Sequence, residues 1–169
     1  SLPNGQQIDM IEAVAEGVIF NNLEHIMDTH VDRMLVLRPR ISEEERAQFI
    51  VEVYSYLGDG YDFLFDFTDS SMQVCTELIY RGINGKGLIN FELTMRAGHE
   101  TLSADDIANY YLNGQAGTFD FVLLVEPVPN SKKHPAAVYT GMEGKARLLA
   151  LMEQEQAKAD KARKQPPHR

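Results

Sequence analysis

Cys75 is the single cysteine of the 169-residue chain, so the chain has no internal disulfide and no thiolate-rich zinc site. A lone cysteine is more often an inert core residue than a nucleophile. Here, however, turn-forming residues at 68–71 precede an apolar spacing that predicts a helix over residues 73–82. Cys75 then falls in or just before the first turn, where the helix dipole favours a thiolate and unpaired amides can stabilise an oxyanion. We predict that the thiol faces a cleft.

A cysteine hydrolase also needs an imidazole that accepts the thiol proton and a polar group that orients the imidazole. The chain has five histidines, and all fall in segments of loop, linker or tail character: His25, His30, His99, His134 and His168. Such settings favour exposed surface imidazoles over a catalytic base. The sequence therefore indicates a candidate nucleophile without an evident base.

The elements that must position Cys75 include four predicted strands, at residues 7–13, 17–20, 31–37 and 119–125. Each is a short apolar or alternating run bounded by glycine or proline. We expect the 31–37 segment to be a central strand, because it is β-branched and apolar and ends before Pro39.

A helix over residues 43–57 is predicted from a capping box, in which Ser42 accepts from the first turn and Glu45 reaches back. Apolar residues recur along this helix at three- and four-residue spacing. We expect this stripe to pack on a sheet; its members are Ala47, Ile50, Val51, Tyr54 and Leu57.

Two further helices are predicted nearer the C-terminus. One begins at the start signal of residues 103–106 and runs to Leu112. The other spans residues 142–164 and is apolar only in its first half, so its polar end is expected to project into solvent. These patterns indicate one α+β domain over residues 1–135, followed by a C-terminal helix and polar tail over residues 136–169.

Charge and hydropathy exclude several classes of partner. The net charge is −9, from 25 acids against 16 bases, and nine of those bases lie from Lys132 onward. The preceding part is more acidic still and repels phosphate backbones, so we expect no nucleic-acid partner. Apolar runs such as those at 34–37 and 121–125 are far below the ~18 residues of a membrane helix, so we expect no transmembrane segment.

The first residues contain no initiator methionine and no signal-peptide pattern, so the chain is interpreted as a fragment or processed product and its compartment stays open. The histidine and carboxylate residues do not recur at the sequence spacing of a metal-binding motif. The glycine-containing segments GDGYD and GINGKG do not lie between a strand and a helix, as a phosphate-binding loop does. We therefore predict no metal and no cofactor.

Four ordered segments carry a family resemblance. Residues 57–65 read Leu-Gly-Asp-Gly-Tyr-Asp-Phe-Leu-Phe and precede Val-Cys-Thr-Glu-Leu at 74–78, while Ile-Glu-Ala and Glu-Gly-Val lie upstream at 11–13 and 16–18. This set resembles the permuted papain-like amidases of the NlpC/P60 superfamily, in the YaeF/YiiX group, over residues 7–127. Thr76 stands where the family usually has serine, and either hydroxyl is expected to cap the helix.

The resemblance implies a papain-like α+β fold, in which an antiparallel sheet packs against helices and the nucleophile lies at a helix N-terminus. It implies a cysteine hydrolase or acyltransferase that acts on an amide or ester, either a peptidoglycan-type peptide or an acyl lipid. By this match Cys75 is the nucleophile and Glu12 orients the histidine. Tyr61 matches a site-lining tyrosine.

The same residues have plainer interpretations. Glu12 reads equally as a solvated carboxylate on an edge strand, and a tyrosine in an aromatic cluster, such as Tyr61, is by default a core residue. Asp62 is expected to fix a turn. The alternatives to an enzyme are a binding module of the same fold, without catalysis, and a structural α+β protein with a buried Cys75.

The histidine strand of the family precedes the Glu12 strand and has no counterpart among these 169 residues. We therefore interpret the domain as N-terminally incomplete. We expect no histidine beside Cys75 and a free sheet edge beside the Glu12 strand. The oligomeric state stays open, with the C-terminal helix as a candidate contact.

Overall fold

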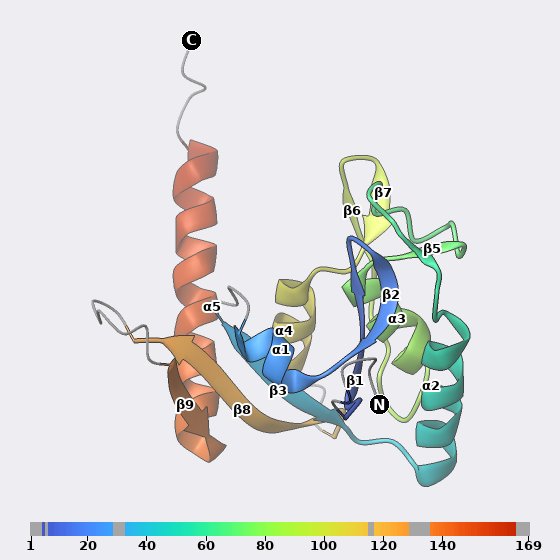
Figure 1. Ribbon diagram of the computed structural model, residues 1–169. Helices are drawn as coiled ribbons and strands as arrows, with labels where there is room; N and C mark the ends of the chain where they lie inside the picture. The colour runs from blue at the N-terminus through green and yellow to red at the C-terminus, as the bar shows by residue number, and fades with distance from the viewer. Residues whose placement is uncertain (1–4, 6, 29–32, 115–116, 129–135, 165–169) are drawn as a thin grey trace.

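The computed structural model describes residues 5, 7–28, 33–114, 117–128 and 136–164 (Figure 1). Within these ranges the chain is an α+β fold of five helices and small sheets, most of them antiparallel. The described helices include none with the length and apolar character needed to cross a bilayer.

The largest sheet contains β3 (Met34–Pro39), β8 (Phe119–Pro127) and β9 (Ala136–Thr140), with all neighbours antiparallel. β8 lies in the middle, and its Leu124 is fully buried. The expectation that the 31–37 segment is central is therefore wrong. The reason is β9, whose pairing with the second edge of β8 was not evident from the sequence.

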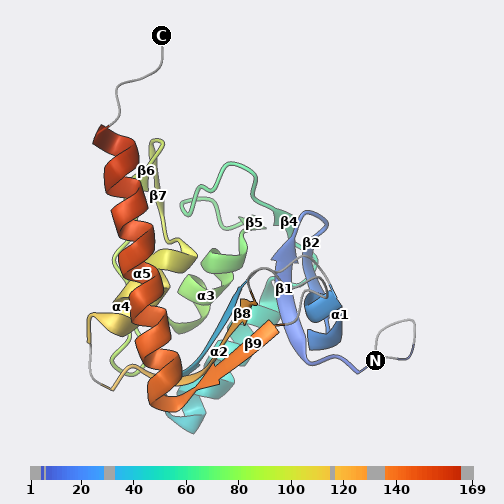
Figure 2. The same ribbon diagram turned by 90° about the vertical axis from the view of Figure 1, so that its left-hand side faces the viewer.

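A long C-terminal helix, α5 (Gly141–Lys164), covers this sheet beside α4 (Ala104–Leu112), as Figure 2 shows. The predicted helices are confirmed. A buried cluster joins the three elements and consists of Ala108, Leu124, Leu148 and Leu151. Gly144 allows the close approach, because a Cβ there would lie 2.5 Å from the Phe121 ring. β9 and the first half of α5 therefore pack on the same core as β8.

The helix α2 (Glu43–Ser55) begins at the predicted capping box, in which Glu45 N–H donates to Ser42 Oγ at 3.1 Å and Ser42 N–H donates to Glu45 Oε2 at 2.8 Å. Its predicted packing face is wrong. α2 packs mainly on α3 (Cys75–Ile83) and not on a sheet, and its buried residue is Val53; of the stripe, Tyr54 meets the Phe20 ring at 5.5 Å. The close helix contact depends on Gly82, where a Cβ would lie 2.5 Å from the Phe49 ring.

The N-terminal hairpin pairs β1 (Met10–Val14) with β2 (Gly17–Asn21) and is followed by the short helix α1 (Leu23–Asp28). Backbone bonds hold the hairpin to the turn after α2: Val18 N–H donates to the Asp59 carbonyl at 2.9 Å, and Gly58 N–H donates to the Val18 carbonyl at 3.0 Å.

Four shorter strands were not predicted, because they have two or three residues each and show no periodicity. β4 (Gly60–Tyr61) and β5 (Met72–Gln73) form a parallel pair, the exception among antiparallel pairs. β6 (Thr94–Arg96) and β7 (His99–Thr101) form an antiparallel hairpin. His99 therefore begins a strand and not a loop. After β7, the expected cap is present, since Asp106 N–H donates to Ser103 Oγ at 3.1 Å.

Candidate functional site

Cys75 is the first residue of α3, and its side chain is exposed. The thiol lines a cavity of about 200 Å³ between β1, α2 and α3. The other lining residues are Ile11, Glu12, Ala13, Phe49, Val53, Leu78 and Ile79. The predicted position of Cys75 in the first helical turn, facing a cleft, is confirmed.

A buried ion pair between Glu77 and Arg81 holds the start of α3 in place. Val74 is the extended residue before the helix, and its N–H donates to Glu77 Oε2 at 3.3 Å. Glu77 is fully buried and accepts from Arg81 Nε at 2.9 Å. Burial raises the pKa of Glu77, while its hydrogen bond from Arg81 acts in the opposite direction. The cap thus comes from Glu77, and the expected hydroxyl cap from Thr76 is absent, since Thr76 is the second helical residue.

A second cavity of about 380 Å³ continues the first along β1, beside α2. Together the two cavities are lined by every residue from 8 to 13. Successive side chains of a strand point to opposite faces, so a wall made of six successive residues is the edge of the strand and not a face. We call this the β1 groove.

The edge that lines the β1 groove is unpaired in the described part of the chain, where β1 bonds only to β2. The expected free edge is confirmed. The opposite wall is apolar and comes from Phe49, Ile50, Val53 and Tyr54 of α2. Two members of the predicted stripe, Ile50 and Tyr54, therefore line the β1 groove and remain about half exposed.

Glu12 lines the cavity beside Cys75, and its Oε1 accepts a hydrogen bond from Asn21 Nδ2. Its neighbours Ile11 and Ala13 pack with Leu78 of α3. Strand alternation therefore directs the Glu12 side chain to the other face of the hairpin. The carboxylate has access to the cavity only across the edge of β1.

Tyr61 does not line either cavity of the β1 groove. Its ring packs at 4.9 Å from the Phe63 ring and 6.4 Å from the Phe65 ring. Burial raises the pKa of the Tyr61 phenol, and the nearby charges of Cys75 and Asp62 act in the same direction. Tyr61 is thus a neighbour of Cys75 within an aromatic cluster.

Asp62 has the turn-forming role that was expected. Its side chain is buried, with Oδ1 accepting from Leu64 N–H at 2.8 Å and Oδ2 accepting from Asp66 N–H. These bonds hold the backbone of the loop that follows Tyr61.

No histidine of the described ranges lines the β1 groove. His25 is exposed on α1, and His99 lies on β7 with Nδ1 3.5 Å from Asp66 Oδ2. His30, His134 and His168 lie outside the described residues. The described part also contains no cluster of histidine, cysteine and carboxylate residues that could hold a metal ion.

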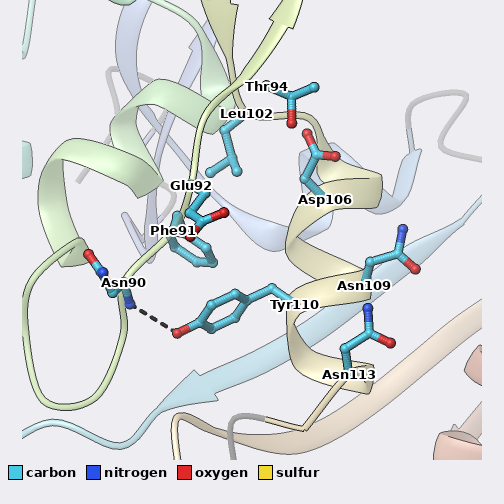
Figure 3. Close-up of a pocket in the computed structure, with 9 residues that line it drawn as sticks. All are labelled: Asn90, Phe91, Glu92, Thr94, Leu102, Asp106, Asn109, Tyr110 and Asn113. Carbon is cyan, nitrogen blue, oxygen red and sulfur yellow. Dashed lines mark hydrogen bonds between the residues drawn. The ribbon is translucent and has the colours of Figure 1, made fainter.

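A larger cavity of about 420 Å³ lies between residues 90–94 and α4 (Figure 3). Three asparagines and two carboxylates contribute to its lining, and the Tyr110 hydroxyl accepts from Asn90 N–H at 2.9 Å. Asp106 is engaged by Arg96 Nη2 at 2.7 Å. Sequence reasoning missed this cavity because no residue pattern marks it. We place the candidate site at the β1 groove despite its smaller cavities, because it is lined by Cys75, the single thiol of the chain.

In comparisons with known proteins, no protein family, no curated protein and no solved structure matches this chain.

Proposed function

We propose that this chain is part of a papain-like thiol hydrolase or acyltransferase of the permuted NlpC/P60 type, with Cys75 as its nucleophile. One observation carries the proposal: the only thiol of the chain is the first residue of α3 and opens into a cavity bounded by the strand of Glu12. A buried structural cysteine, by contrast, would lie in the core.

The chemistry follows from the position of Cys75. A base takes the proton of the Cys75 thiol, and the thiolate attacks the carbonyl carbon of an amide or ester. A C–S bond forms, the C–N or C–O bond breaks, and the base gives the proton to the leaving group. Water or an acyl acceptor then cleaves the thioester. The N–H groups of Cys75 and Thr76, the first two of α3, have no partners within the helix, so they can donate to the oxyanion.

The base would come from a strand that pairs with the free edge of β1. Such a strand would lie in the β1 groove, with its apolar side chains against Phe49, Ile50 and Tyr54 of α2. An imidazole on that strand would reach Cys75, and Glu12 is the proposed orienting group across the same strand edge. The chain alone should therefore show only background hydrolysis.

Thiol reactivity tests whether Cys75 is activated. Cys75 should react with iodoacetamide at neutral pH faster than free cysteine, because the helix N-terminus stabilises the thiolate. The matched control is Ile79→Cys in a Cys75→Ala background, one turn further along α3 in the same cavity. Equal rates at the two positions would reject an activated nucleophile and favour the binding module.

Restoring a strand tests the second half of the proposal. A version of the chain extended upstream by a histidine-bearing strand should hydrolyse an activated ester, and Cys75→Ala should abolish this. Replacing the added histidine by glutamine should leave binding of the strand intact and remove the activity. Glu12→Gln should lower the rate while the thiol stays reactive. If the extended chain binds its strand but shows no hydrolysis, the domain is a binding module.

A further inference from the structure

The loop between β4 and β5 exposes three consecutive large apolar residues. The exposed fractions are 69% for Phe63, 69% for Leu64 and 48% for Phe65. The described residues contain no other run of three such side chains in the exposed class. We call residues 63–65 the apolar tip.

The apolar tip is held in place by the protein. The buried carboxylate of Asp62 accepts from the N–H groups of Leu64 and Asp66, and the Tyr61 ring packs against the rings of Phe63 and Phe65. Phe65 has φ of +55°, a conformation that bulky residues seldom adopt. The strained backbone at Phe65 has a cost in free energy, and the folded loop nevertheless holds these three side chains in solvent and not in the core.

A second exposed apolar side chain lies on the adjoining hairpin. Met95 of β6 is 63% exposed, and His99 of the same hairpin contacts Asp66 of the loop at 3.5 Å. The hairpin and the loop rise at the same end of the molecule, at the top of Figures 1 and 2. The apolar tip and Met95 thus belong to one end of the fold.

Size and charge indicate what this end contacts. A specific protein interface buries roughly 800 Å² on each partner, which far exceeds a tip of three side chains. Shallow insertion into the headgroup region of a bilayer needs only a few Phe or Leu side chains. The loop bears Asp62, Asp66 and Asp69 and no base, and the chain has a net charge of −9, so attraction to anionic lipid is not the driving force.

We propose that the apolar tip inserts into the interfacial region of a zwitterionic lipid bilayer. The insertion brings the end of the molecule that contains Tyr61, the neighbour of Cys75, to the membrane surface. Insertion of the apolar tip does not require the Cys75 thiol. We therefore expect Cys75→Ala to bind vesicles as the wild type does. The failure of the insertion and that of the proposed enzyme are therefore separate outcomes.

Tryptophan fluorescence provides the test, since the chain contains no tryptophan. Phe63→Trp should give an emission shift to shorter wavelength on addition of phosphatidylcholine vesicles, with quenching by brominated acyl chains. Val51→Trp, on α2 at a site of equal exposure, is the matched control and should give no shift. A shift in neither variant, as for a tip that binds only a protein, or an equal shift in both would overturn the proposal.

Vesicle sedimentation gives a second measurement. Phe63→Ser with Leu64→Ser should lower partitioning by about tenfold or more, because two apolar side chains no longer leave water. Val51→Ser with Leu88→Ser removes two apolar side chains of similar exposure elsewhere and should change partitioning by less than about twofold. Phosphatidylglycerol in the vesicles should weaken binding at low salt. Binding only to phosphatidylglycerol vesicles would contradict the proposal.

Discussion

Glu77 and Arg81 connect a buried charge to the position of the thiol. Glu77 is fully buried, accepts from Arg81 Nε, and caps Val74 immediately before Cys75. Arg81 also donates to the Phe67 carbonyl at 3.0 Å, within the loop between β4 and β5. The Glu77–Arg81 pair therefore holds both the start of α3 and the loop between β4 and β5.

Removing one partner of this pair should be costly. Glu77→Ala leaves Arg81 largely buried without its carboxylate, so we expect a loss of about 3 kcal/mol in the free energy of unfolding. Urea denaturation measures this loss. The control is Glu153→Ala on the exposed face of α5, which should change stability by less than about 0.5 kcal/mol. A similar effect in both variants would contradict the structural role of Glu77.

The raised pKa of Glu77 gives a pH dependence with a definite sign. Because burial raises the pKa above the ordinary value of 4.5, the folded state holds this proton more tightly than the unfolded state. The contribution of Glu77 to stability is therefore fully present below pH 4.5 and is lost as the pH rises through the raised pKa. Between pH 4.5 and the raised pKa of Glu77, the free energy of unfolding of the wild type relative to that of Glu77→Gln should fall. A relative stability that rises with pH would contradict this assignment.

The N-terminal hairpin comes close to the turn after α2, and this approach requires a glycine at position 17. Gly17 has φ of +110°, and a Cβ there would overlap the Asp59 carbonyl oxygen. This close approach lets Val18 bond to the turn after α2 and lets Ala13 pack on Leu78 of α3. The wall of the cavity at Cys75 depends on that contact.

Gly17→Ala should therefore destabilise the protein by about 2 kcal/mol, from the strained φ and the backbone overlap together. It should also change the alkylation rate of Cys75, because the β1 wall moves. Gly58→Ala is the matched control, since Gly58 has φ of +92° and open space around it. Its cost should be limited to the φ strain, about 1 kcal/mol. If Gly17→Ala and Gly58→Ala lower the stability equally and change the alkylation rate of Cys75 equally, the backbone overlap at Gly17 is unimportant.

The elements also show which features the sequence could predict. The capping boxes at Ser42 and Ser103 and the start of α3 are local, so residues within one turn determine them. The stripe on α2 was assigned to the wrong partner, because periodicity identifies an apolar face but not what covers it. β9 and the edge geometry of Glu12 depend on pairing between distant segments. The approach of the Glu12 strand to the Cys75 helix was predicted from the resemblance, but the Glu12 side chain was expected to face the cavity and instead lies on the other face of the hairpin. The catalytic roles of Cys75 and Glu12 stay predictions.

The C-terminal helix α5 covers the core over β8. Leu148 and Leu151 belong to the cluster around Leu124, and Arg147 Nε donates to the buried carboxylate of Glu126 on β8. Beyond Met152 the described side chains of α5 are mostly exposed. Only the first half of this helix therefore stabilises the fold.

Two adjacent leucines test this division. Leu148→Ala should lower the free energy of unfolding by about 3 kcal/mol, because the side chain is buried against β8. Leu149→Ala, at 48% exposure, should cost less than about 1 kcal/mol. Thermal or urea denaturation of the two variants gives the comparison. Matching losses would mean that α5 does not pack on β8 through this face.

The open edge of β1 also governs how copies of this chain meet in solution. Natural edge strands resist pairing through lysine, proline or bulges, but β1 reads MIEAV, and its one charge, Glu12, is already bonded to Asn21. Two copies that approach edge to edge can join β1 to β1 and extend two hairpins into a single four-stranded antiparallel sheet. Self-association should therefore increase with protein concentration. A strand seated in the β1 groove would suppress it, so the concentration at which aggregates appear reports whether that edge is covered.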